Sequence, residues 1–212
     1  MKKLPFQKVL AISPHTDDIE FGCGGTLARL QEEGAEIHTA IFSHCEASVP
    51  EGYPKNILLK EMHNSSDILN IEEDKRHIFD YPVRRFSEHR QDILENLVQL
   101  KKDIHPDLVL TTSTFDVHQD HTVICKESIR AFRFTTLLGY ELPWNNLEFK
   151  NQLIFELEER HIQEKIKLIN CYKSQNFRTY GTPELFMDGA VVRGIQNKRG
   201  LAESFEVIKM YL

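Results

Sequence analysis

Short apolar runs that alternate with longer helical patterns constrain the fold of this chain most strongly. The runs KVLAIS (8–13) and LVLTT (108–112) are typical of strands buried on both faces. Elsewhere, apolar residues recur at three- and four-residue spacing, which indicates helices. Strands that alternate with helices predict a mainly parallel sheet with right-handed crossovers. We therefore expect an α/β fold, a Rossmann-like three-layer sandwich with a mainly parallel sheet in the strand order 3-2-1-4-5 or a similar order.

The remaining elements follow from the same patterns. Three further strands are expected at residues 36–42, 77–81 and 151–156. Helices are expected at residues 19–33, 57–70, 87–104, 120–133, 158–172 and 203–210. One core can serve chains of up to about 250 residues, so residues 1–212 are expected to form a single domain.

Composition and charge restrict the classes of function. The net charge of -6 argues against a nucleic-acid surface, which would need clustered basic residues. The sequence has no run of about 18 apolar residues, which a membrane-spanning helix would need. The apolar run at residues 9–12 is too short for the hydrophobic region of a signal peptide, so a cytoplasmic protein is expected. The four cysteines show no C-x-x-C spacing, which argues against a zinc knuckle or redox pair and suggests that most are buried. The sequence leaves a homo-oligomer open.

Two clusters of histidine and aspartate stand directly after the two clearest strands. Pro14-His15-Thr16-Asp17-Asp18 follows residues 8–13, and Asp116-Val117-His118-Gln119-Asp120-His121 follows residues 108–112. In the expected strand order these strands are neighbours, and ligands bind in the crevice beyond their carboxyl ends. The clusters are therefore expected to meet at one site.

Their side chains predict a metal centre. Two imidazoles and one carboxylate, from His15, Asp18 and His121, would provide three protein ligands and leave a fourth position open, as in catalytic zinc sites. Zinc lowers the pKa of its bound water to about 7, which makes hydroxide available as a nucleophile at neutral pH. Because metal availability also decides occupancy, the ion could be Zn²⁺, or Fe²⁺ in the cell.

Three further residues of the clusters are candidates for the chemistry itself. Asp17 lies between two predicted ligands and is a candidate general base. His118 could stabilise an oxyanion or act as an acid, and Asp120 could orient an imidazole.

Structural explanations compete with these assignments. A single histidine is more often a structural or surface residue than a ligand, and adjacent aspartates can simply offset a helix dipole. The glycines of Gly22-Cys23-Gly24-Gly25 resemble a dinucleotide-binding loop, but Asp17 and Asp18 would repel a pyrophosphate. These glycines instead favour close approach of a helix to the sheet or to the metal loop.

The two motifs resemble those of the PIG-L-type, or LmbE-like, zinc-dependent N-deacetylases. The resemblance rests on PHTDDIEFGCGGT (14–26) and DVHQDH (116–121), with weaker similarity at residues 140–145, 172–175 and 202–206. Thr16 is a departure, because many members have proline at that position.

The resemblance implies the same roles as the residues themselves suggest. It implies zinc ligands at His15, Asp18 and His121, a base at Asp17 and an oxyanion-stabilising imidazole at His118. It also implies a small-molecule substrate, an N-acetylglucosamine-type group on inositol, malate, a lipid or another carrier. The carrier is not identified by the sequence.

A few residues outside the motifs are candidates for holding that substrate. Arginines could bind a phosphate or carboxylate, and a tryptophan could stack on a sugar ring. These candidates are Arg85, Arg90, Trp144, Arg178 and Arg193. Singly, each is more often a packing residue.

Two other functions remain open at this stage. Two histidines and a carboxylate also form the facial triad of non-haem iron enzymes, although a spare base at Asp17 has no obvious task there. A sugar-binding module without turnover is the other alternative, although such a module would normally lack a ligand or the base.

Overall fold

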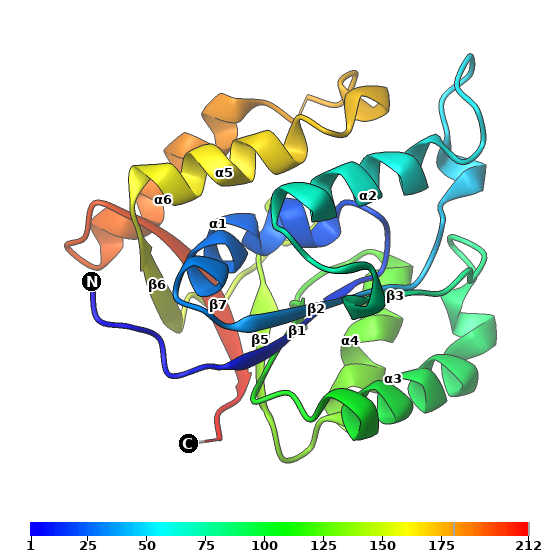
Figure 1. Ribbon diagram of the computed structural model, residues 1–212, viewed down its shortest axis with the longest axis horizontal. Coiled ribbons are helices and arrows are strands. Elements are labelled where there is room, and N and C mark those ends of the chain that lie inside the picture. Colours follow the sequence, from blue (N-terminus) through cyan, green and yellow to red (C-terminus); the bar gives the residue numbers. More distant parts are fainter. Residues whose placement is uncertain (180, 212) are drawn as a thin grey trace.

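A seven-stranded sheet forms the middle layer of the computed structural model, which describes residues 1–179 and 181–211 (Figure 1). Its strand order is β3-β2-β1-β4-β5-β7-β6. The first five strands in this order run parallel, and β7 is antiparallel to both of its neighbours. The strands are β1 (Lys8–Ser13), β2 (Glu36–Ile41), β3 (Arg76–Ile78), β4 (Leu108–Thr112), β5 (Thr136–Tyr140), β6 (Leu153–Leu157) and β7 (Leu201–Lys209). The expected fold class and the order of its first strands are confirmed.

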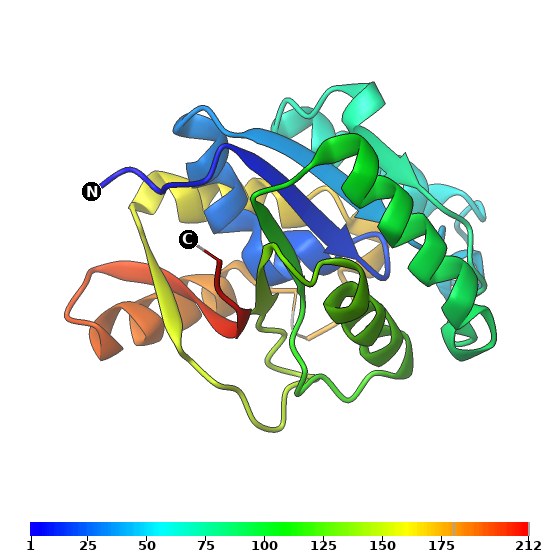
Figure 2. The ribbon, with the colours of Figure 1, turned by 90° about the horizontal axis from the view of Figure 1, so that it is seen from below.

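Helices cover both faces of the sheet. The helices are α1 (Asp18–Glu32), α2 (Ile57–Ile68), α3 (Arg90–Ile104), α4 (Gln119–Ala131), α5 (Glu159–Ile169) and α6 (Pro183–Gln196). One face carries α1, α2, α5 and α6, and the other carries α3 and α4, as the two ribbon views show (Figures 1 and 2). The result is the three-layer sandwich expected for strands that are buried on both faces.

The residues of β1 show how one strand supplies both cores. Val9 and Ala11 pack into the core beneath α1 and α5, whereas Leu10 and Ile12 pack into the core beneath α3 and α4. This division follows from the alternation of side chains along a strand. All four side chains are fully buried, which explains why the sequence of β1 is continuously apolar.

The glycines of α1 allow this helix to lie close to the sheet. A Cβ atom at Gly22 would lie 2.2 Å from Cδ2 of Tyr140 on β5, far inside van der Waals contact. The expectation that these glycines serve close packing is therefore confirmed. At the other end of α1, Gly34 has a φ of +86°, the conformation expected of a glycine that follows a helix.

The C-terminal third differs from the sequence expectation. The helix predicted over residues 203–210 is wrong, because these residues form β7 between β5 and β6. The strand predicted fifth, over 151–156, is β6 at the sheet edge, and the strand beside β4 is β5, which the sequence patterns did not indicate. Helix α6 was also not predicted. Pairing on both edges decides the conformation of β7, overriding the weak local preference of its sequence.

Smaller differences concern the ends of elements. β3 covers only Arg76–Ile78, and a 3₁₀ turn at Phe86–His89 precedes α3.

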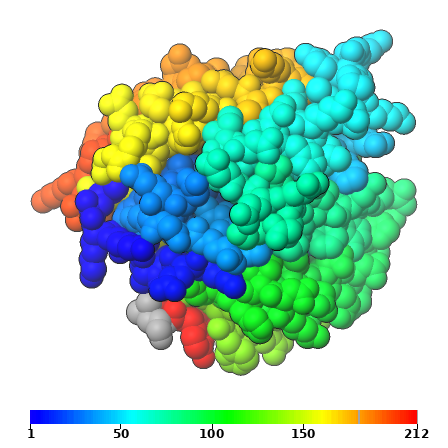
Figure 3. Space-filling model, in the orientation of Figure 1, coloured from blue at the N-terminus to red at the C-terminus, as the bar shows by residue number. Residues whose placement is uncertain are grey.

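Three of the cysteines are buried, as expected, and Cys171 is half-buried. In the space-filling view the loop between β2 and α2, drawn in cyan, projects from the rest of this face (Figure 3). Within the described residues, no helix combines the length and hydrophobicity that a bilayer span requires.

Candidate metal centre and active site

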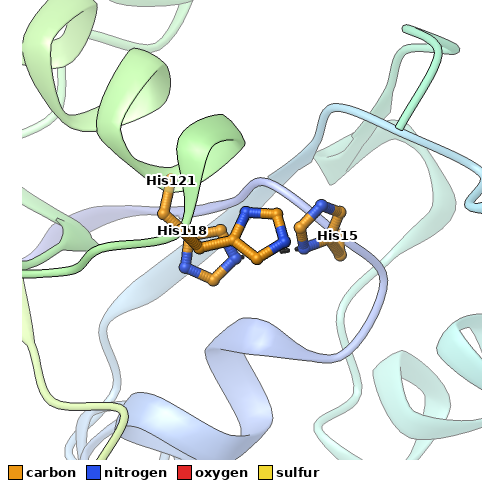
Figure 4. A group of neighbouring side chains, drawn as sticks. All are labelled: His15, His118 and His121. Carbon is orange, nitrogen blue, oxygen red and sulfur yellow. Dashed lines mark hydrogen bonds between the residues drawn. The ribbon is translucent and has the colours of Figure 1, made fainter. Parts of the chain in front are cut away.

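Parallel pairing of β1 with β4 brings the two polar motifs together. Leu10 of β1 is in register with Val109 of β4, so both strands end at the same edge of the sheet. His15 lies in the loop after β1, and His118 and His121 lie at the start of α4, after β4. The three imidazoles face one another, with ring nitrogens within 4.8 Å (Figure 4). The meeting of the two motifs at one site therefore agrees with the topology argument.

Three donor atoms form a nearly equilateral triangle within this group. His15 Nδ1 lies 3.1 Å from His121 Nε2 and 3.2 Å from Asp18 Oδ2, and the third side, from His121 Nε2 to Asp18 Oδ2, measures 3.4 Å. Ligands of a tetrahedral zinc ion with bonds near 2.05 Å lie roughly 3.3 Å apart. The triangle therefore fits three ligands of one small divalent cation.

Each imidazole of the triangle has a carboxylate behind its outward nitrogen. Asp120 Oδ2 lies 3.1 Å from His15 Nε2, and Asp116 Oδ2 lies 2.7 Å from His121 Nδ1. Carboxylates in this position fix the tautomer and the orientation of metal-binding histidines. Asp120 thus occupies the orienting place predicted for it, and Asp116 occupies the equivalent place for His121, which the sequence did not single out.

The charges of the triangle and its neighbours shift the pKa values of its residues. Burial by itself lowers the pKa of His121, but the charges of Asp18 and Asp116 outweigh it and raise that pKa to about 10. The pKa of Asp18 lies well below its usual value, because the neighbouring His121 and His15 outweigh the effect of burial. A site that holds a proton so firmly also attracts a metal cation, which would replace the proton.

His118 differs from the other two histidines in its hydrogen bonding. Its Nδ1 accepts a hydrogen bond from the backbone N–H of Asp120 at 3.2 Å, which makes His118 the N-cap of α4. Burial and the neighbouring His121 and His15 lower the pKa of His118 to about 4, so its ring is neutral at pH 7. A neutral ring that accepts at Nδ1 carries its proton on Nε2. His118 is therefore a hydrogen-bond donor toward the site, and the triangle with Asp18 is the better donor set for a cation.

Asp17 lies beside the triangle without belonging to it. It is the N-cap of α1, where its side chain makes no capping hydrogen bond, and it lines the pocket over the site. Burial and the adjacent Asp18 raise the pKa of Asp17 to about 6, although Arg178 opposes this shift. Asp17 and Asp18 both stand at a helix N-terminus, so the dipole explanation holds as well and does not exclude the chemical one.

A pocket of about 330 Å³ opens over these residues. Two of the predicted substrate-binding residues, Trp144 and Arg178, line it. Three residues that were not among the predicted substrate-binding residues also line it: Arg84, Gln175 and Asn145.

The other three arginines named from the sequence lie elsewhere. Arg85 is exposed and paired with Glu88, Arg90 is paired with Glu127, and Arg193 is paired with Glu141. None of the three lines the pocket.

Comparison with known proteins agrees with the geometry. Residues 10–132 match the family model PIG-L, described as GlcNAc-PI de-N-acetylase. The chain belongs to the PIG-L family. A relative in Escherichia coli K12, named as an uncharacterized deacetylase, YaiS, is 30% identical over 172 residues, which is 78% of this chain and 90% of the relative.

Solved structures share the fold of this PIG-L member. The N,N'-diacetylchitobiose deacetylase of Pyrococcus horikoshii superposes with a TM-score of 0.75 at 21% identity, covering 96% of this chain and 84% of that one. The 4-carboxy-2-hydroxymuconate hydratase GalB of Pseudomonas putida superposes with a TM-score of 0.80 at 19% identity, covering 97% and 98%. At these identities the likeness shows the fold alone. The hydratase demonstrates that the activity has to be argued from the site.

Proposed function

We propose that this PIG-L member is a metal-dependent hydrolase that removes the N-acetyl group of an amino-sugar conjugate. The observation that carries the proposal is the triangle of His15, Asp18 and His121, with a carboxylate behind each imidazole. Family membership supports deacetylation, and the description of the family as a GlcNAc-PI de-N-acetylase supports an acetylated amino sugar as the substrate class.

The donor set suits zinc, and iron in the cell is compatible with the same ligands. Two imidazoles and one carboxylate are common ligands of both ions. When bound, such an ion supplies a water of lowered pKa and polarises the amide carbonyl.

The chain's own residues would then handle the protons and the developing charge. Asp17, free of the donor triangle, takes the proton of the attacking water as general base. His118 donates from Nε2 to the carbonyl oxygen, on which negative charge develops as the tetrahedral intermediate forms. Asp17 next delivers its proton to the sugar nitrogen, and the C–N bond breaks to give acetate and the free amine.

Two experiments test the proposal. The purified protein, loaded with zinc, is incubated with a panel of N-acetylglucosamine conjugates, and acetate and free amine are quantified with and without a chelator. We expect equimolar acetate and amine that disappear when the metal is removed. Release of neither product across the panel would contradict the proposal. Oxygen consumption with iron would favour the non-haem iron alternative, and tight binding without turnover would favour the binding module.

The second experiment tests the role of Asp17. Asp17→Asn is expected to lower kcat about 10²- to 10⁴-fold, the usual contribution of a general base, while zinc content measured by atomic absorption stays at the wild-type level. Glu88→Gln, at an exposed residue outside the pocket, serves as the control and should keep full activity. Unchanged kcat in Asp17→Asn would remove Asp17 from the mechanism.

A further inference from the structure

The side chain of Arg84 lines the pocket and forms no ion pair within the described residues. Its guanidinium donates to the hydroxyl of Ser48 at 3.1 Å. The charge of Arg178, the other arginine of the pocket, favours the ionised form of Asp17 and so opposes the rise in the pKa of that carboxyl. The neighbouring Arg85 turns outward and is paired with Glu88. Arg84 is therefore the arginine of this pocket available to a charged group on a ligand.

The backbone of Arg84, which lines the pocket, is held in an unusual conformation. Its φ is +68°, a region that residues with a Cβ adopt at a cost. Asp120 fixes this turn, because its carboxylate accepts from the N–H of Arg84 at 2.5 Å and from the N–H of Phe86 at 3.3 Å. The same carboxylate holds His15. One buried aspartate thus sets the place of a metal-site imidazole and of Arg84 together.

Gln175, which also lines the pocket, has one side-chain atom without a hydrogen-bond partner among the described residues. The residue is 4% exposed, and the atom without a partner is Oε1, although Nε2 donates to Ser174. A buried carbonyl oxygen without a donor costs free energy unless a ligand or water supplies one. Because this oxygen has almost no accessible surface, it does not itself face the pocket, and the charge presented to a ligand is that of Arg84.

We propose that the pocket selects amino-sugar conjugates whose carrier bears an anion, a carboxylate or a phosphate, and that Arg84 is the residue that recognises it. This inference rests on the proposed deacetylase function and narrows its substrate class. A guanidinium offers parallel N–H donors that match the oxygens of either anion. The pocket also contains Asp17 and Asp18, and the positive charge of Arg84 offsets their repulsion of an anionic carrier.

The test compares three conjugates that differ only in the charge of a small carrier. N-acetylglucosamine is linked to glycerol, to glycerate or to glycerol phosphate, and kcat and KM are measured for the zinc-loaded wild type, Arg84→Gln and Arg85→Gln. We expect wild type to prefer at least one anionic conjugate over the glycerol conjugate by roughly 10- to 100-fold in kcat/KM, mainly through KM. Arg84→Gln should abolish that preference, and Arg85→Gln should keep it. The glycerate and glycerol phosphate arms show which anion is recognised.

Binding provides a readout that does not depend on turnover. Calorimetry on the zinc-loaded Asp17→Asn variant should show the same preference for the anionic conjugate, and adding Arg84→Gln to this variant should remove it. Equal kcat/KM and equal affinity for charged and neutral conjugates would overturn the role of Arg84 while leaving deacetylation intact. Selective binding of an anionic conjugate by the wild-type protein, with no release of acetate from that conjugate, would instead overturn the deacetylase function and support the anion site.

Discussion

At the scale of residues, two aspartates beyond the donor triangle organise the site. Asp116 accepts from the backbone N–H of His118 through Oδ1 and contacts His121 Nδ1 through Oδ2. Asp120 connects His15 to the turn at Arg84. Each carboxylate thus joins a predicted metal ligand to a residue that would contact the substrate.

The substitution Asp116→Asn removes the negative charge of this residue but keeps a side-chain oxygen that can accept a hydrogen bond. The amide oxygen can still accept from His118, but the negative charge behind His121 is lost. Partners of metal-binding histidines typically contribute 10- to 100-fold to affinity, so we expect zinc affinity to fall by about that factor. Competition with a chelator measures it, with unchanged circular dichroism as evidence that the fold is retained. Zinc affinity equal to that of wild type would exclude this role.

A second prediction concerns a histidine pair far from the metal centre. His77 Nε2 lies 3.3 Å from His38 Nδ1, and burial together with His38 lowers the pKa of His77 below 6.5. The unfolded chain therefore binds a proton at His77 at a higher pH than the folded chain does. The stability that comes from the neutral folded form is fully present above the ordinary histidine pKa and is lost as the pH falls toward the lower pKa of the folded chain.

His77→Gln is expected to reduce the dependence of the unfolding free energy on pH as the pH falls below the ordinary histidine pKa. Urea unfolding at several pH values measures it. His38→Gln should have a smaller effect in the same direction, because it removes only the neighbouring charge. An identical pH dependence in wild type and His77→Gln would show that the pair does not contribute.

Several residues of the site were predictable because they follow strands directly. His15, Asp18 and His121 belong to motifs whose place in the fold is set by β1 and β4. Arg84 was not predictable, since nothing in the sequence distinguishes Arg84, which lines the pocket, from Arg85, which is exposed and paired with Glu88. Asp116 was missed for a similar reason, because its role depends on the orientation of the ring of His121.

At the scale of elements, the position of α1 depends on its contact with β5. Gly22 faces the ring of Tyr140, and the hydroxyl of Tyr140 donates to the backbone oxygen of Ile12 on β1 at 3.0 Å. This contact fixes the distance between α1, which begins with Asp18, and the strand that precedes His15.

Gly22→Ala is expected to destabilise the protein by about 1–3 kcal/mol, because the added methyl group overlaps the Tyr140 ring. Gly189→Ala is the matched control, since Gly189 also lies in a helix but a Cβ there meets nothing within 4 Å. The control should be stabilised by about 0.5–1 kcal/mol through helix propensity. Denaturant unfolding measures both, and equal effects would refute the packing argument.

The elements that were mispredicted are those whose sequences give weak or conflicting local signals. β7 contains Glu203 and Glu206, which are buried although charged, so no clean alternation is visible. Glu203 accepts from Thr26 of α1 and from Lys165 of α5, contacts that only the folded chain provides. For α6, Pro183 at the first helical turn was a readable start signal, but two internal glycines obscure its periodicity.

At the scale of the whole molecule, the proposed metal site is a contact between two distant parts of the chain. His15 and Asp18 come from the first βα unit, and His121 comes from the loop and helix after β4, more than a hundred residues later. These ligands converge only in the folded protein. Metal binding is therefore expected to be linked to global folding.

Addition of zinc to metal-free protein should raise Tm in proportion to the logarithm of the zinc concentration once the site is saturated. Stabilisation of about 2.7 kcal/mol is expected when free zinc reaches 100 times its Kd. Differential scanning fluorimetry measures the shift. Asp18→Asn replaces a carboxylate ligand with a weaker amide, so its Tm should respond much less to zinc, whereas Arg85→Gln should respond as wild type does. If all three proteins respond equally, zinc binds elsewhere, and the convergence of His15, Asp18 and His121 would not be the metal centre.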